Sequence, residues 1–327
     1  MLAVLAATAS AAHASIAFCD RPPQLNAAQQ DRLLRFAALI KRSLDDGGRR
    51  IALVARSGMD LGEMGVRYSH AGISLRDSAN TAWSVRQLYF ACDERRSRLF
   101  DQGLAGFVLG LDPSADGYVS VVQVPPSHDA RLADAALDNR IALNLLDGAY
   151  SANAYPFSTQ YQNCNQWVIE MLATAWGGLA GSDGGGDANA TNTNTNTNTN
   201  TNTNTNTNTN GDGDARDDPA LRERAQQWLA DSGYQPSLFR VAYRPMIWAS
   251  AFVPWVHTRD HPDEDVDDKR FRVSMPASIE DFVHARVPGA TRTEFCLSGS
   301  RIVVRHSWTP IADGCAAADG DTVVALD

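Results

Sequence analysis

The chain has 327 residues, 44% of them hydrophobic, which is enough to form one large or two modest buried cores. Its formal net charge of −9 argues against a nucleic-acid partner, because such partners bind basic surfaces. No apolar run approaches the length of a membrane span, so we expect no integral membrane segment.

Residues 1–17 have features of a secretory signal. They are apolar and rich in alanine, and Ala-His-Ala before Ser15 fits a small-x-small cleavage site. A basic region at the start is missing, so a simple alanine-rich tail is the alternative. We expect an exported protein, periplasmic or secreted.

Export changes the interpretation of the cysteines, because oxidising compartments favour disulfides and an odd count leaves one thiol over. The five cysteines are Cys19, Cys92, Cys164, Cys296 and Cys315. As a hypothesis, we pair Cys19 with Cys92 and Cys296 with Cys315. Spacing does not fix the connectivity, but this pairing makes Cys164 the free thiol.

The first half of the chain alternates predicted helices and strands. Asn26 can cap a helix that runs to about Asp46 and presents an apolar stripe. A short helix is predicted over residues 98–110, one of about eighteen residues after a Ser127 cap, and another starting near Cys164. Strands are predicted within residues 49–58, 66–75, 81–90 and 117–124.

The chain is divided by a low-complexity insert at residues 177–218, which includes ten Thr-Asn pairs and should be disordered. We therefore expect a core at residues 18–176 and a C-terminal part at residues 219–327 that completes or flanks it. In that part we expect a helix after Pro219, a helix capped by Ser278, a hairpin within residues 293–308 and a last strand.

Cys164 stands where a predicted helix begins, within "YQNCNQWVIEML". Free N–H groups and the positive end of a helix dipole stabilise an anion, so a thiol there gains thiolate character and nucleophilicity. The alternative is a small buried hydrophobe. The flanking Asn163, Asn165 and Gln166 favour the nucleophile, because they make an apolar setting less natural.

His70 is the best-placed of the seven histidines to act as its partner. "YSHAGISL" puts it in the middle of a predicted strand, and Gly72 leaves room beside it for another element to approach. An imidazole close to Cys164 could take and return its proton. A hydrogen-bonded structural histidine is the alternative.

Two short motifs carry a resemblance. "SHAGI" resembles the His-x-Gly strand of NlpC-type, papain-like hydrolases, and "NCNQWV" resembles the Asn-Cys-x-x-Phe/Trp-Val helix start of relatives of lecithin retinol acyltransferase. His precedes Cys by 94 residues, the order of the circularly permuted branch. More closely, the chain resembles the domain of unknown function (DUF) family 2145, through "FCDRPP", "YSHAGI", "CDERRSRLFDQGL", "YPFSTQYQNCNQWVIEML" and the late Cys296/Cys315 segment.

The resemblance implies an α+β, circularly permuted papain-like fold, in which an antiparallel sheet packs against the cysteine-bearing helix. It implies a thiol chemistry with Cys164 as nucleophile and His70 as general base and acid. A polar residue on the next strand should orient the imidazole. Of Ser84, Arg86 and Gln87 we favour Gln87, since its amide oxygen can accept from the ring N–H.

An oxyanion would be bound by the backbone N–H of Cys164 with help from a nearby side chain, for which Asn163, Gln162 and Tyr68 are candidates. The expected function is thus an exported thiol hydrolase or acyltransferase acting on an amide or ester. By resemblance, its substrate is a cell-wall peptide or a lipid acyl group.

The alternative function is a non-enzymatic periplasmic scaffold or binding protein that retains the fold. The sequence contains no Cys-x-x-Cys or His-Glu-x-x-His spacing, so we expect no metal site, and no cofactor is expected.

Overall fold

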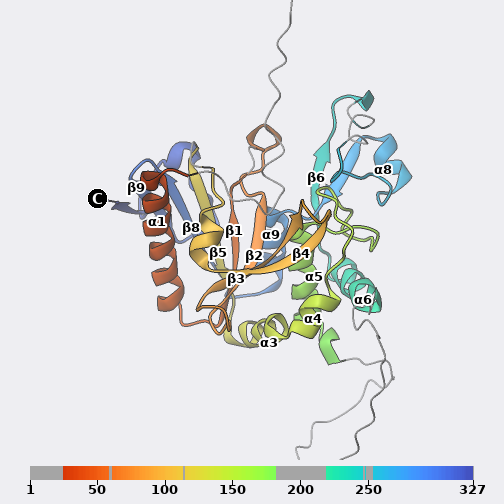
Figure 1. Ribbon diagram of the computed structural model, residues 1–327, viewed down its shortest axis with the longest axis horizontal. Coiled ribbons are helices and arrows are strands. Elements are labelled where there is room, and N and C mark those ends of the chain that lie inside the picture. The colour runs from red at the N-terminus through yellow and green to blue at the C-terminus, as the bar shows by residue number, and fades with distance from the viewer. Residues whose placement is uncertain are drawn as a thin grey trace, which may run out of the picture.

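A computed structural model gives the fold and describes residues 25–58, 61–112, 115–181, 219–245, 247 and 253–326 (Figure 1). The signal-like segment, Cys19 and most of the predicted insert lie outside these residues. Within them the protein is an α+β fold built on antiparallel strands, as expected.

The centre of the molecule is an eight-stranded sheet in the order β10-β9-β8-β5-β1-β2-β3-β4, with antiparallel neighbours throughout. Its strands are β1 (Ile51–Arg56), β2 (His70–Leu75), β3 (Ser84–Ala91), β4 (Arg96–Gln102), β5 (Gly117–Gln123), β8 (Thr291–Ser298), β9 (Arg301–Arg305) and β10 (Thr322–Ala325). All six residues of the central β1 are buried, because helices cover both faces of the sheet.

The helices form two layers. On one face, α1 (Ala27–Asp46) and α2 (Leu104–Val108) share a core with Val54, Val85 and other alternate strand residues. The core of the other face includes side chains of α3 (Pro126–Leu137), α4 (Asn139–Asn144), α5 (Cys164–Trp176), α6 (Pro219–Asp231) and α9 (Pro276–Arg286).

A smaller unit stands beside the main sheet. It consists of β6 (Ser237–Arg240) paired with β7 (Arg270–Val273), together with α8 (Asp263–Asp267), and it is seen at the upper right of Figure 1. Three short 3₁₀ turns, η1 (Gly62–Met64), η2 (Leu179–Gly181) and η3 (Asp313–Cys315), complete the described elements.

Several predicted elements are confirmed. Asn26 caps α1 through a capping box with Gln29, and the helix ends at Asp46. The hairpin and the last strand near the C-terminus are β8, β9 and β10. Because β8 pairs with β5, these strands complete the main sheet.

Other boundaries differ from the prediction. The segment 98–110 was expected to be helical, but its first part belongs to β4, which pairs along its length with β3, and only α2 is helical. The helix expected after Ser127 starts at Pro126, since proline suits the first helical position. It breaks at Asp138, whose extended backbone and side chain cap α4.

Two further residues are displaced from their predicted positions. Ser278 is the third residue of α9, and the N-cap is Met275, because Pro276 again occupies the first position. His70 is the first residue of β2, whereas a position in the middle of the strand was expected. The strand begins late because residues 61–66 form a separate turn closed by the Leu61–Val66 bridge.

The cysteines follow the proposed pattern where they are described. Cys296 and Cys315 form a disulfide with a Cα–Cα distance of 5.5 Å, and Cys164 is free and buried. Cys92 is also disulfide-bonded, while Cys19 lies outside the described residues. Among the described helices, none combines the length and apolar character needed to cross a membrane.

Candidate active site

Cys164 is the first residue of α5, as predicted. Asn163 precedes it in an extended conformation and its Oδ1 accepts from the N–H of Gln166 at 2.7 Å, which is an ordinary N-cap. Burial raises the pKa of the Cys164 thiol to about 12, although backbone N–H groups, including that of Asn165, favour its anion. In this state the sulfur is therefore a neutral thiol at neutral pH.

The His70 ring is held by the next strand. Nε2 of His70 lies 2.8 Å from Oε1 of Gln87, so the proton belongs on Nε2, since an amide oxygen only accepts. In this orientation of the Gln87 amide, its Nε2 donates to Oε1 of Gln102 at 2.9 Å. The ring also stacks on Tyr89 with 4.5 Å between centroids. Gln87 thus makes the contact expected of an orienting residue.

The His70 ring is neutral as well. Burial, and after it the positive charge of Arg56, together lower the pKa of His70 to about 3, although the hydrogen bond to Gln87 acts in the opposite direction. Arg56 stands directly opposite His70 in the β1–β2 pairing. A buried imidazole beside a guanidinium does not readily accept a second proton.

Asn165 connects the thiol to the histidine strand. Its Oδ1 accepts from the N–H of Ala71 at 2.9 Å, and its Nδ2 donates to the carbonyl of Ser69 at 3.4 Å. The residue after Cys164 is thus hydrogen-bonded to the backbone on both sides of His70. This brings the start of α5 against the start of β2.

The thiol of Cys164 and the imidazole of His70 nevertheless lie in different surroundings. The ring of His70 contacts Tyr89 and Phe107 of α2, whereas Cys164 packs in the core of the α5 face. Within the described residues no hydrogen bond joins the two side chains. Direct proton transfer between them therefore requires a movement of the ring, the helix start or both.

The three predicted oxyanion side chains have other partners. Gln162 is fully buried and bonds Leu145, Asp147 and Glu170, while Asn163 caps α5. The Tyr68 hydroxyl donates to Glu294 and accepts from Arg292, and burial raises the pKa of Tyr68 well above its usual value. The structure therefore brings none of these three side chains to the thiol by a hydrogen bond, because each is needed to satisfy buried polar groups elsewhere.

A family profile described as "Uncharacterized protein conserved in bacteria (DUF2145)" matches residues 43–283, more than half of the chain. The chain belongs to the DUF2145 family. The resemblance to this family in the sequence is thereby confirmed. No curated protein and no solved structure matches the chain.

The DUF2145 match contains Cys164, His70 and Gln87, but it ends before β8 and η3, which carry the disulfide-bonded Cys296 and Cys315. Two residues inside the match were missed by the sequence analysis as parts of the site. Arg56 and Asn165 both contact the surroundings of His70. A charged residue closing the otherwise apolar strand "IALVAR" is the signal that could have found Arg56.

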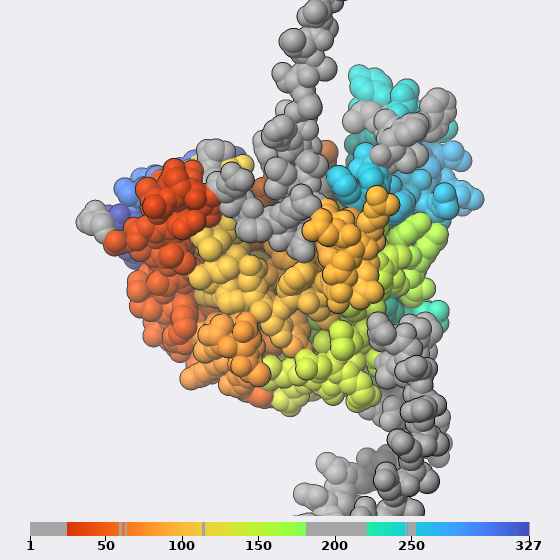
Figure 2. All heavy atoms as spheres, in the orientation of Figure 1, coloured from red at the N-terminus to blue at the C-terminus, as the bar shows by residue number. Residues whose placement is uncertain are grey.

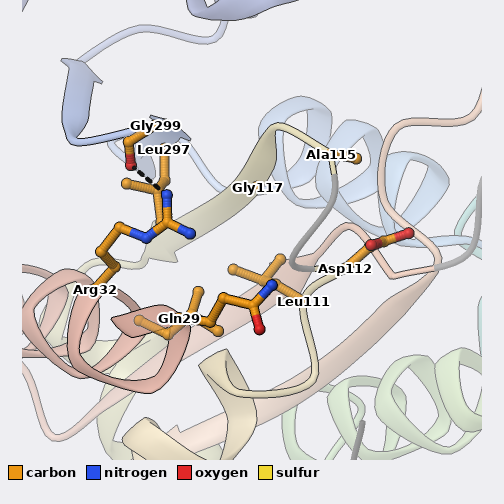
Figure 3. A pocket seen from close by; sticks show the side chains of 9 residues that line it. Gln29, Arg32, Leu111, Asp112, Ala115, Gly117, Leu297 and Gly299 are labelled. Atoms are coloured by element: carbon orange, nitrogen blue, oxygen red, sulfur yellow. Dashed lines mark hydrogen bonds between the residues drawn. The ribbon is translucent and has the colours of Figure 1, made fainter. Parts of the chain in front are cut away.

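Two hollows of the molecule lie away from these residues. A pocket of about 40 Å³ lies between the start of α1 and the β8–β9 turn, where Arg32 donates to Gly299 at 3.4 Å (Figure 3). A wider groove of about 690 Å³ runs between the end of α1 and β8–β10, and it includes His306 and Trp308. Neither hollow is lined by Cys164, His70 or Gln87.

Across the part of the chain that is described, no group of three or more His, Cys, Asp or Glu side chains has a geometry that could hold an ion.

Proposed function

We propose that this protein is a thiol-dependent hydrolase or acyltransferase that acts on an amide or ester, with a circularly permuted papain-like arrangement. Cys164 is the nucleophile, His70 the general base and acid, and Gln87 the orienting residue. The observation that carries the proposal is the Asn165 side chain, which ties a helix starting with a free thiol to the backbone on both sides of a histidine. Gln87 fixes the tautomer of that histidine.

The proposed reaction uses the nitrogen of His70 that Gln87 leaves free. Nδ1 takes the thiol proton as Sγ of Cys164 attacks the acyl carbon, and the tetrahedral oxyanion is met by backbone N–H groups at the start of α5. The imidazolium then gives its proton to the departing amine or alcohol, and a thioester remains. Water or a second nucleophile attacks the thioester, which regenerates the thiol.

The resting pair is neutral, and this sets a requirement for catalysis. A thiol pKa of about 12 and an imidazole pKa of about 3 oppose proton transfer between the two groups as they stand. Substrate binding must therefore bring the ring to the sulfur and change the solvation of both.

An exported protein is also part of the proposal, supported by the signal-like segment and by the Cys296–Cys315 disulfide, which suits an oxidising compartment. A cell-wall peptide is the first substrate class and a lipid acyl group the second. Both contain an acyl carbon for the thiol to attack.

The second candidate is a periplasmic scaffold or binding protein that retains the fold. The burial of both neutral groups and the missing hydrogen bond between them favour it. In this case Cys164 is simply a small core residue.

The test uses an activated ester and the folded protein. Wild type, Cys164→Ala, His70→Ala and the control His306→Ala are incubated with p-nitrophenyl acetate, and peptide mass spectrometry locates any acetyl group. The hydrolase predicts acetylation of Cys164 that is slowed roughly 100-fold or more in His70→Ala, the size of a general-base effect, and unchanged in His306→Ala. The scaffold predicts a thiol that reacts only after unfolding in urea, and this result would remove the enzyme proposal.

A further inference from the structure

Arg56 is a buried cation, and its hydrogen-bond partners among the described residues are all neutral. Its side chain ends β1, and the residue is only 6% exposed. The guanidinium donates to the carbonyls of Gly110 at 2.6 Å and Ser57 at 3.2 Å, and to the Tyr89 hydroxyl at 2.7 Å. In the described part of the chain no carboxylate forms an ion pair with it. Burying a charge without a counter-ion is costly, so such a residue calls for an explanation.

The unused donors of Arg56 match a particular kind of anion. A guanidinium has five N–H groups, and the three hydrogen bonds occupy two on Nη1 and one on Nη2. One N–H on Nη2 and the N–H on Nε remain, and Nε is fully buried with no partner among the described atoms. Two N–H groups are the number that a carboxylate accepts in a bidentate pair.

The surroundings hold the guanidinium beside the candidate active site. A Cβ atom at Gly58 or at Gly110 would lie 2.5 Å from a guanidinium nitrogen, so the backbone at both glycines approaches the Arg56 side chain closely. Arg56 is opposite His70, and Tyr89, which bonds Arg56, stacks on the His70 ring. Three neighbouring strands thus place a cation, a hydroxyl and an imidazole together.

We propose that Arg56, with the Tyr89 hydroxyl beside it, binds a carboxylate group of the substrate next to His70. A single negative charge would neutralise the buried cation, whereas a phosphate dianion would leave a buried excess of negative charge. The substrate would therefore be an acyl compound, such as a peptide, with a free carboxylate close to the bond that is cleaved. That the bound compound is a substrate rests on the proposed function, but the binding of its carboxylate does not.

The binding test avoids catalysis altogether. Cys164→Ser protein labelled with ¹⁵N at arginine is titrated with N-acetylglycine, and the Nε–H signals of the arginines are followed by NMR at constant ionic strength. The matched control ligand is N-acetylglycinamide, which has the same shape and no charge, and phosphate is the second comparison. Arg56→Lys identifies the Arg56 signal and keeps the positive charge but not the planar pair of donors.

We expect one saturable downfield shift of the Arg56 Nε–H signal with N-acetylglycine, and none with the amide. Titration calorimetry, which does not depend on the arginine signal, should show a loss of affinity of about tenfold or more in folded Arg56→Lys, since two charge-assisted bonds are replaced by one. An Nε–H signal of Arg56 that does not move would overturn the proposal. So would tighter binding of phosphate, or equal binding of the uncharged amide.

The two proposals fail in different ways. If the carboxylate binds to Cys164→Ser but wild type forms no acyl-enzyme, the carboxylate site stands and the protein is a binding protein. In the other case, Cys164 is acylated, but Arg56→Lys prefers an ester with a free carboxylate over the matching ester with an uncharged amide as strongly as wild type does. The hydrolase then stands and the carboxylate site is wrong.

Discussion

Asn165 and Ala71 are joined by a 2.9 Å hydrogen bond between a side-chain oxygen and a backbone N–H, and this bond links the thiol-bearing helix to the histidine strand. Asn165 is only 2% exposed, so water cannot easily replace the contact. The position of Cys164 relative to His70 therefore depends on Asn165, the residue that follows the thiol in α5.

Replacing Asn165 with Ala should destabilise the protein and loosen the start of α5. The N–H of Ala71 would be buried without an acceptor, which costs about 1–3 kcal/mol of unfolding free energy. Urea unfolding measures the loss, and iodoacetamide should alkylate Cys164 faster. Asn144→Ala is the control, because Asn144 is partly exposed at the end of α4. Equal effects of the two changes would contradict the anchoring role.

His70 should make the protein less stable as the pH falls. The unfolded chain takes up a proton near the ordinary pKa of 6.5, but the folded chain does so only near pH 3, so the unfolded state binds more protons between these values. Stability contributed by neutral His70 is present above pH 6.5 and is lost below it, by ~1.4 kcal/mol per pH unit.

Unfolding free energies from pH 7 to pH 4 test this, in wild type and in His70→Asn. The difference between the two proteins should change with pH, whereas His306→Asn, an exposed histidine near β9, should run parallel to wild type. Parallel curves for His70→Asn would mean that the ring is not buried in neutral form.

Arg222 should be among the most sensitive positions for stability. Glu170 on α5 is fully buried and accepts from Arg222 on α6 at 3.1 Å, from Gln162 at 2.6 Å and from Gln226 at 2.7 Å. Arg222→Met would leave the Glu170 carboxylate buried without its cation, so we expect a loss of about 3–5 kcal/mol in urea unfolding.

An exposed ion pair provides the comparison. Arg35 and Asp31 are 2.9 Å apart within α1, with side chains 51% and 60% exposed. Arg35→Met should therefore cost about 0.5 kcal/mol or less. If Arg222→Met costs no more than this, α6 is not held to α5 through Glu170.

The Cys296–Cys315 disulfide should contribute about 3 kcal/mol, because it closes a loop with a sequence separation of 19 residues. It also holds the segment of Ile311, whose N–H donates to Glu294 and whose carbonyl accepts from Arg67. The double change Cys296→Ala, Cys315→Ala should lower the thermal midpoint under oxidising conditions. Adding a reductant should then lower the midpoint less in this variant than in wild type, and an equal drop in both would contradict the assignment.

Local signals in the sequence were sufficient for much of the secondary structure. The Asn26 cap and the apolar stripe behind it defined α1, and short apolar runs located β1 and β5. The start of α5 near Cys164 followed from the helical spacing of the residues behind it, and the Asn163 cap was found only in the structure. These features depend on neighbours within a few residues, so a single sequence contains them.

The predicted pairing of Gln87 with His70 depended on a longer inference. Family resemblance indicated a polar residue on the next strand, and an amide oxygen was the best acceptor there, which the 2.8 Å contact matches. Helix interruption at Asp138 was not foreseen, since the apolar spacing continues across it and only the cap shows the break.

By itself, then, the sequence determined where most elements lie and that Cys164 stands near the start of a helix, because these features depend on neighbours along the chain. Tertiary structure alone decided that β8 lies beside β5, that Gln162, Asn163 and Tyr68 serve other partners, and that Arg56 is buried beside His70. It also set the protonation of Cys164 and His70, because the cost of burying a charge is a sum over all surrounding atoms, most of them distant in the chain.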